Sequence, residues 1–203
     1  MALLALLLGL ASAPRAANAE AARYRIDREA SRVFIHVGKA GLLSFAGHEH
    51  EVAAPDVRGT VTADAERPEQ TSVEVTFDAS ALRVTGAGEP AKDVAEVQRT
   101  MLGPECLDAA RFPTIRFVSS SVAAAGEEAG ARRLAIHGAL TLHGVTRPII
   151  LHARVEFEGD KVEASGTLTV RQTDFGIKPI SKAGVVNVKD ELDIKWRLVG
   201  RRN

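Results

Sequence analysis

The sequence predicts an all-β fold of antiparallel strands, closed into a sheet or barrel, with one short helix. Three observations predict it. Apolar and polar residues alternate with a period of two from Arg32 almost to the end of the chain, and polar breaks with Gly or Pro separate most of the runs. One segment, from about Pro90 to Leu107, follows helical spacing instead. Clean alternation of this kind is typical of antiparallel sheets with one face in water.

The expected strands follow one another along the chain. In the first clear one, Val33, Ile35 and Val37 share a face, because successive side chains of a strand point to opposite sides. Gly144 and the pair Gly159-Asp160 are expected in tight turns between later strands. The later same-face sets are Val73, Val75, Phe77 and Ala79; Leu134, Ile136, Gly138, Leu140 and Leu142; Ile149, Leu151, Ala153, Val155 and Phe157; Val162, Ala164, Gly166, Leu168 and Val170; and Leu192, Ile194, Trp196 and Leu198.

The segment from about residue 90 to 107 is expected to be a helix. Four apolar residues recur at helical spacing, and Gly103-Pro104 is a stop signal. They are Val94, Val97, Met101 and Leu102. A single helix among strands suits a lid on an open sheet or barrel end. The Ala-, Gly- and Glu-rich stretch 123–131 is expected to be an exposed hairpin loop.

Residues 1–19 are expected to be a signal peptide, which predicts a periplasmic or secreted protein. Ala2 to Ala13 is an unbroken run of apolar and small residues, and Ala17-Asn18-Ala19 fits a cleavage site before Glu20, although the run has no Lys or Arg ahead of it. The run is shorter than the roughly 20 residues of a membrane-spanning helix. Residues 20–203 are then expected to form one domain that does not span a membrane.

Composition argues against several classes of function. The formal net charge is zero, and no basic patch of the kind that binds nucleic acid is present. The single cysteine, Cys106, cannot form an intramolecular disulfide. It lies between Glu105 and Asp108, whose charges would raise the thiol pKa, so we interpret it as a structural residue.

Several segments together resemble the YceI-like, polyisoprenoid-binding family over about Arg23 to Val199. They are Tyr24–Asp27, Ser31–Ile35, Phe112–Ser119, Gly138–Pro148, Gly166–Val170 and Thr173–Ile177. The resemblance implies an extended antiparallel lipocalin-like β-barrel of about eight strands with one short inserted helix. It also implies an apolar lumen for a long isoprenoid or acyl chain, and no cofactor.

Alternation parity selects the candidate ligand-binding residues. A residue on the apolar face of a strand is expected to point into the barrel. The predicted lumen residues are Val33, Ile35, Val75, Phe77, Phe117, Leu140, Leu142, Leu151, Val155, Leu168, Val170 and Ile194, and the predicted mouth residues are His48, His50 and Arg171.

Two interpretations of the interior remain open at this point. Small inward residues favour a hollow barrel; they are Ala79, Gly138, Ala153, Ala164 and Gly166. Alternatively, these residues accommodate Trp196, Phe117 and Phe157 in a solid core, because natural interiors pack closely. A hollow barrel favours a binding protein for a long apolar molecule. A solid barrel favours an interaction module, and the sequence, which does not fix the oligomeric state, is compatible with a homodimer.

The segment Gly47–Glu51 departs from the commoner pattern of the resembled family, because it carries His48 and His50. The two imidazoles would lie on one side of a strand and could bind zinc with a third ligand. The candidates for that ligand are His36, His137, His143 and Glu105. A metal-dependent hydrolase is thus the one enzyme hypothesis. No nucleophile elbow, phosphate loop or dinucleotide fingerprint is present, so we predict a polar mouth, no metal and no enzyme.

Overall fold

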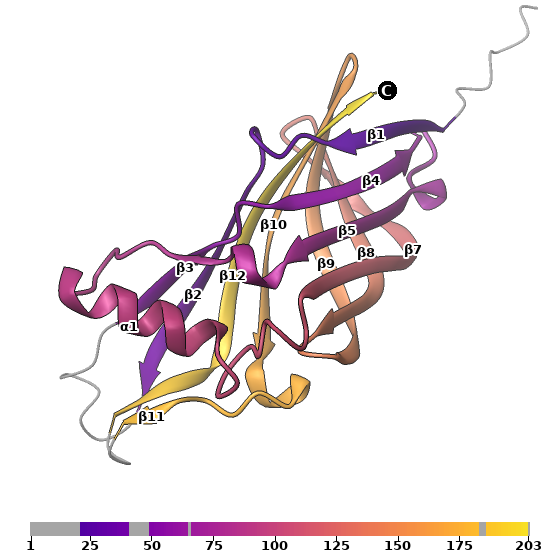
Figure 1. The fold of residues 1–203 in the computed structure, drawn as a ribbon. Coiled ribbons are helices and arrows are strands. Elements are labelled where there is room, and N and C mark those ends of the chain that lie inside the picture. The colour runs from indigo at the N-terminus through magenta and orange to yellow at the C-terminus, as the bar shows by residue number, and fades with distance from the viewer. Residues whose placement is uncertain (1–20, 41–48, 65, 183–185, 203) are drawn as a thin grey trace, which may run out of the picture.

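The computed structural model describes residues 21–40, 49–64, 66–182 and 186–202, and its strands form an antiparallel barrel (Figure 1). The all-β prediction is therefore confirmed. Eight strands close the ring, each antiparallel to its neighbours. In order around the barrel they are β1 (Ala22–Ile26), β4 (Val57–Ala63), β5 (Ser72–Asp78), β7 (Thr114–Glu128), β8 (Ala131–Leu142), β9 (Val145–Glu158), β10 (Lys161–Arg171) and β12 (Val186–Arg202).

Strand β12 closes the barrel because one of its edges serves two partners. Its first part pairs with β2 (Arg32–Ala40), and its last residues, Gly200–Arg202, pair with β1. Two shorter strands, β3 (His50–Ala53) and β6 (Arg83–Val84), continue the sheet beyond β2. The wall is therefore completed by β1 at one end of the molecule and by β2, β3 and β6 at the other. The two-residue strand β11 (Ser181–Lys182) pairs with the start of β12.

The α-helix α1 (Ala91–Leu102) lies alongside the ends of β2 and β3, at the opposite end of the molecule from β1 (Figure 1). The side chain of Gln98 fastens the helix to β6. Its amide nitrogen donates a hydrogen bond to the Leu82 carbonyl oxygen at 2.9 Å, and its amide oxygen accepts one from the Val84 N–H at 2.8 Å. An exposed strand edge carries unpaired backbone groups, and Gln98 pairs two of them. The helix ends at Leu102 with Gly103 as its C-cap, at the stop signal that the sequence predicted.

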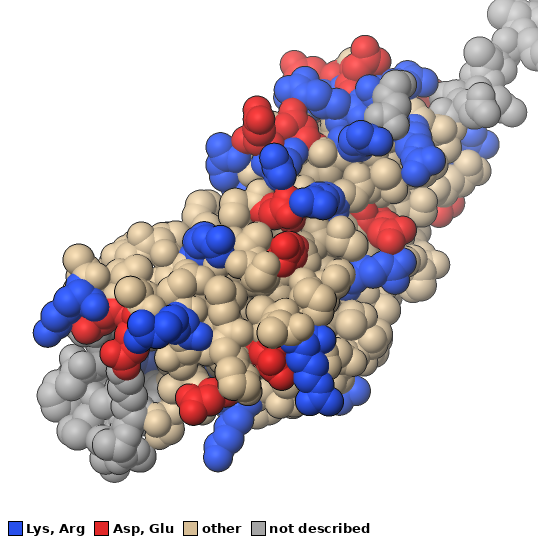
Figure 2. Space-filling view, viewed as in Figure 1, with Lys and Arg blue, Asp and Glu red and all other residues tan. Residues whose placement is uncertain are grey.

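The interior contains the apolar faces of the strands, as the period of two predicted. Val33, Phe117, Leu140 and Trp196 belong to one cluster of buried residues. The outer face is polar: Arg197 pairs with Glu163 there (Nε to Oε1, 2.6 Å). On the face shown in Figure 2, basic and acidic side chains are interspersed.

The prediction of an exposed hairpin loop over residues 123–131 is correct for the exposure of residues 123–130 and for the hairpin turn, but most of the stretch is strand. β7 continues to Glu128, β8 begins at Ala131, and only a two-residue turn separates them. Ala129 and Gly130 have φ of 49° and 78°, which is the left-handed backbone that such tight hairpin turns require. Residues 123–128 are all exposed, so neither face of this part of β7 is buried. An alternation signal is absent where both faces meet water.

Asp27 joins the turn between β1 and β2 to the end of β12. Its carboxylate accepts hydrogen bonds from the N–H groups of Glu29 and Ala30, each at 3.1 Å, and from Arg201 Nε at 2.6 Å. The bond from Arg201 is the largest cause that holds the pKa of Asp27 below its ordinary value of 3.8. The contact with Arg201 thus favours the ionised form of the carboxylate that holds the turn.

Candidate functional site

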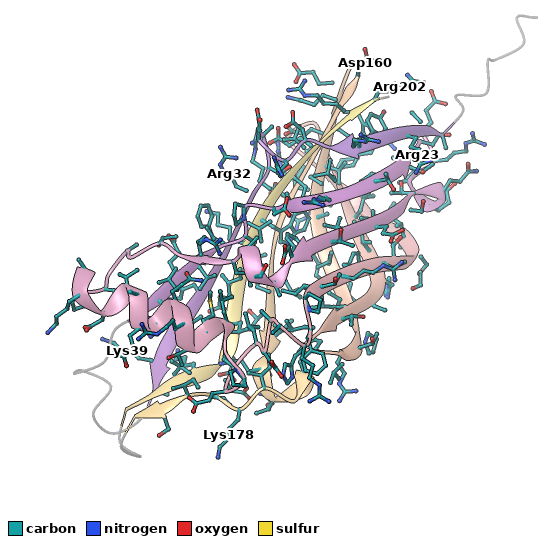
Figure 3. All side chains as sticks on the ribbon, viewed as in Figure 1. Arg23, Arg32, Lys39, Asp160, Lys178 and Arg202 are labelled. Carbon is teal, nitrogen blue, oxygen red and sulfur yellow. The ribbon has the colours of Figure 1, made fainter. Side chains whose placement is uncertain are left out.

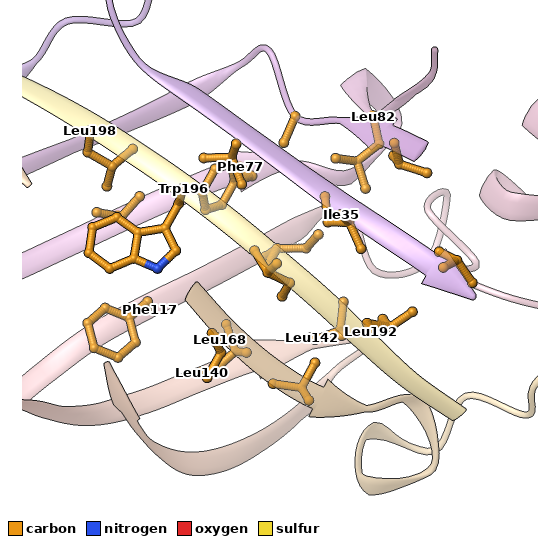
Figure 4. A pocket seen from close by; sticks show the side chains of 18 of the residues that line it. Ile35, Phe77, Leu82, Phe117, Leu140, Leu142, Leu168, Leu192, Trp196 and Leu198 are labelled. Carbon is orange, nitrogen blue, oxygen red and sulfur yellow. The ribbon is translucent and has the colours of Figure 1, made fainter. Parts of the chain in front are cut away.

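A cavity of about 590 Å³ lies inside the barrel (Figure 4). Side chains from the strand walls and from α1 line it, and most of them are apolar. The interior is therefore not a solid core, which answers the question that parity left open. The apolar residues labelled in the close view are Ile35, Phe77, Leu82, Phe117, Leu140, Leu142, Leu168, Leu192, Trp196 and Leu198.

All twelve apolar residues predicted for the lumen line this cavity. Parity places them correctly because the pleat sends every second side chain inward along each strand. Their contact with a ligand stays a prediction. The twelve are Val33, Ile35, Val75, Phe77, Phe117, Leu140, Leu142, Leu151, Val155, Leu168, Val170 and Ile194.

The three predicted mouth residues have different outcomes. His50 lines the cavity. Arg171 does not: its side chain is 63% exposed and lies 3.6 Å from Glu191 on the outer surface. Placing Arg171 at the mouth was inconsistent with parity, because its neighbour Val170 points inward. His48 lies outside the described residues.

The predicted set omits many residues that line the cavity, and two groups of them show why. Trp196 and Leu198 share the inward face of β12 with Ile194, so parity could have included them. The second group comes from the α1 region, where Val97 and Met101 were assigned to a helix but not to the cavity. The helical spacing of these apolar residues was the available signal, but it did not show which part of the barrel the helix covers.

Glycines allow two aromatic rings to lie against the barrel wall. Gly166 is opposite Trp196 in the pairing of β10 and β12. A Cβ atom at residue 166 would lie only 2.7 Å from Cζ2 of the Trp196 ring. Similarly, a Cβ at Gly138 would lie 2.5 Å from Cζ of the Phe117 ring. The bare backbone therefore holds both large rings close to the wall and leaves space in the middle of the barrel.

Polar groups gather at the end of the cavity that α1 covers. His50 Nδ1 lies 2.8 Å from Glu89 Oε1, and the Glu89 side chain is 1% exposed. The two atoms are close, but their alignment does not make a hydrogen bond. Figure 3 places Lys39 next to α1. The polar residues that line this end are Lys39, His50, Glu89, Asp93, Glu96 and Thr100.

In the described part of the chain, a few buried side-chain polar atoms have no hydrogen-bond partner. Every residue that carries such an atom lines the cavity. The atoms are His50 Nδ1, Thr71 Oγ1, Glu89 Oε1, Glu89 Oε2 and Trp196 Nε1. Buried polar groups in folded proteins are almost always paired with protein or water. These atoms are therefore the polar groups of the cavity that remain without a hydrogen-bond partner in the described part of the chain.

Cys106 also lines the cavity, and burial raises the pKa of its thiol to about 11. The direction agrees with the sequence interpretation, but the cause differs. Desolvation raises the pKa, whereas the neighbouring carboxylates of Glu105 and Asp108 were expected to do so. A thiol with this pKa is protonated at neutral pH and is a poor nucleophile.

The predicted third ligands for a metal are dispersed. His36 is half exposed, with Nε2 3.6 Å from Glu49 Oε2, and His143 Nδ1 lies 3.2 Å from the Phe175 carbonyl oxygen. Within the described ranges, no three His, Cys, Asp or Glu side chains are grouped to hold a metal ion. A search of the same residues finds no helix with the length and apolar character needed to cross a membrane.

Solved structures share this fold. BcnA of Burkholderia cenocepacia superposes with a TM-score of 0.68 at 22% identity, covering 86% of this chain and 98% of that one. A polyisoprenoid-binding domain from Saccharophagus degradans, implicated in plant cell wall breakdown, superposes with a TM-score of 0.63 at 11% identity. It covers 91% of this chain and 100% of that one. At these identities the likeness establishes the fold.

Sequence comparison establishes the family. A UPF0312 protein of Pseudomonas savastanoi pv. phaseolicola is 33% identical over 194 residues, which are 92% of this chain and 91% of that protein. Protein YceI of Salmonella arizonae is 32% identical over 173 residues, which are 79% and 78% of the two chains. The YceI-like domain matches residues 24–199, nearly all of the barrel. The chain therefore belongs to the YceI-like family.

Proposed function

We propose that this protein binds a long apolar molecule in the lumen of its barrel and shields it from water. The observation that carries the proposal is the cavity of about 590 Å³ with a mostly apolar lining. Ligand sites are typically about 300–1,000 Å³, predominantly apolar and largely preformed. Each methylene group removed from water contributes roughly 0.8 kcal/mol, so a long chain would bind well with few specific contacts.

The ligand that we propose is of the polyisoprenoid or fatty-acyl type. The structurally similar domain from Saccharophagus degradans is described as polyisoprenoid-binding, which supports an isoprenoid. An acyl chain has the same apolar character, and the branched lining side chains would pack against either. The protein would act by sequestering or carrying this molecule and not by transforming it.

We also propose that the protein acts in the periplasm or outside the cell. The apolar leader and the Ala17-Asn18-Ala19 site support removal of residues 1–19, which lie outside the described residues. Mass analysis of the protein from its native host, fractionated by compartment, tests this. A mature chain that begins at or near Glu20 in the periplasmic fraction is expected. An intact Met1 on cytoplasmic protein would contradict the proposal.

Extraction of the natively purified protein tests the binding function. Organic extracts, analysed by mass spectrometry, are expected to contain one class of long-chain lipid at near-stoichiometric amount. Trp196 is the single tryptophan and lines the cavity, so its fluorescence should also change when a chain is added to the delipidated protein. Extracts free of lipid, with no fluorescence response to isoprenoid or acyl probes, would overturn the proposal.

A further inference from the structure

The polar end of the cavity is chemically distinct from the rest of the lumen. Asp93, Glu96 and Thr100 line it and recur at spacings of three and four residues, so they share one face of α1. His50 at the start of β3 and Glu89 just before α1 complete it. Three acidic side chains, together with Lys39, therefore lie at this end of a cavity whose other walls are mostly apolar.

Glu89 is a buried acidic residue whose carboxylate oxygens lack hydrogen-bond donors. Its side chain is 1% exposed, and neither carboxylate oxygen has a hydrogen-bond partner within the described part of the chain. Oε1 has the imidazole of His50 at 2.8 Å, out of line for a hydrogen bond. A buried carboxylate without hydrogen bonds is costly, and a donor from a bound molecule would relieve that cost.

The balance of charge at this end disfavours an anion. Among the described residues that line the cavity, Lys39 is the one Lys or Arg, and Lys39 and Glu96 each have an interaction of their own. Glu89, Asp93 and Glu96 all carry acidic side chains. A phosphate or carboxylate placed against the buried Glu89 would meet a like charge, whereas a cation would meet an opposite one.

We propose that the polar end is a head-group site that selects an amphiphile with a protonated amine, whose N–H groups donate to Glu89 while its chain fills the lumen. This inference rests on the proposed function, because the chain must enter the cavity for its head group to reach Glu89. Hydrogen bonds between two charged groups are about twice as strong as neutral ones. An alcohol of the same chain length should therefore bind less well, and a carboxylate least.

Three probes with one chain and different heads test the site: dodecylamine, dodecanol and dodecanoate, each below its aggregation concentration at pH 7. At this pH the amine is cationic and the carboxylate is anionic. Dissociation constants would be measured from Trp196 fluorescence. We expect the amine to bind at least about tenfold more tightly than the alcohol, and the alcohol more tightly than the carboxylate.

The variant Glu89→Gln removes the buried charge and keeps the side-chain shape. It should weaken amine binding about tenfold or more and leave alcohol binding within about twofold. Glu105→Gln is the matched control, because Glu105 is exposed and does not line the cavity. The order of the three probes on the unmodified protein decides the matter even if Glu89→Gln folds poorly.

The outcomes separate the two proposals. If none of the three probes binds, the lumen does not accept a chain and the proposed function fails. If all three bind with equal affinity, or dodecanoate binds best, the amine site is refuted while chain binding stands. An amine preference that persists in Glu89→Gln would also refute the assignment, and so would its loss in Glu105→Gln.

Discussion

Replacing Gly166 with alanine should destabilise the barrel by pushing Trp196 into the cavity. Gly166 is paired with Trp196 on one side and with Ala153 on the other. An added Cβ would lie 2.7 Å from Cζ2 of the Trp196 ring and would also overlap the backbone carbonyl oxygen of His152. Neither neighbour is the free end of a flexible side chain. The strand, the ring or both must therefore move.

The size of the effect follows from these contacts. Overpacking a well-packed interior costs about 1–3 kcal/mol, and we expect about 2–3 kcal/mol because a backbone oxygen held in the β9–β10 ladder is involved. For a chain of this length, each kcal/mol lowers Tm by about 2–4 °C. The expected decrease in Tm is therefore about 4–12 °C. Binding of a long-chain probe should weaken as well, because the displaced ring occupies the lumen.

Thermal unfolding, followed by circular dichroism and by fluorescence, measures both consequences, since Trp196 is the single tryptophan. Ser165→Ala is the control: it changes the neighbouring residue of β10, which does not line the cavity, and should alter stability by no more than about 0.5 kcal/mol. The proposed role of the glycine would be refuted if Gly166→Ala had a Tm within about 1 °C of that of the unmodified protein, with unchanged Trp196 emission and unchanged probe affinity.

Three further predictions concern other parts of the molecule. Cys106 should react slowly with iodoacetamide at pH 8, since its thiol pKa is about 11, and a bound chain should slow it further; equal rates with and without a chain would show that the thiol is reached by another route. Gln98→Ala should lower the free energy of unfolding by about 1–3 kcal/mol and speed the hydrogen exchange of the α1 amides more than that of the barrel amides. An equal increase in both would show that the helix does not detach from the barrel on its own. Asp27→Asn should lower Tm at pH 7, because Arg201 stabilises the ionised carboxylate in the folded protein. That stabilisation is present above pH 3.8 and is lost as the pH falls through the lower pKa of the folded state, so the difference in Tm between the two proteins should shrink below pH 3.8. A difference in Tm that stays constant with pH would refute the role of ionisation.

The alternation of apolar residues was enough to predict the strands and their inner faces. Each strand has a period of two, so a residue such as Leu140 or Leu168 is assigned by counting along the chain, without knowledge of its neighbours. The resemblance to the YceI-like family added the barrel. The same counting would have placed Arg171 outside, next to the inward Val170. Where both faces meet water, as in residues 123–128, counting had nothing to detect.

Other features depend on which distant segments meet, and no local pattern encodes that. The ring of Trp196 lies close to the wall because Gly166, which belongs to a different strand, has no Cβ in its way. Glu89 is preceded by a polar turn and looks exposed in the sequence, yet α1 and β3 bury its side chain against His50. The burial of a charged side chain depends on the packing of the elements around it, whereas the direction in which a strand residue points depends on the backbone alone. This is why the apolar walls could be predicted from residue order and the polar end of the cavity could not.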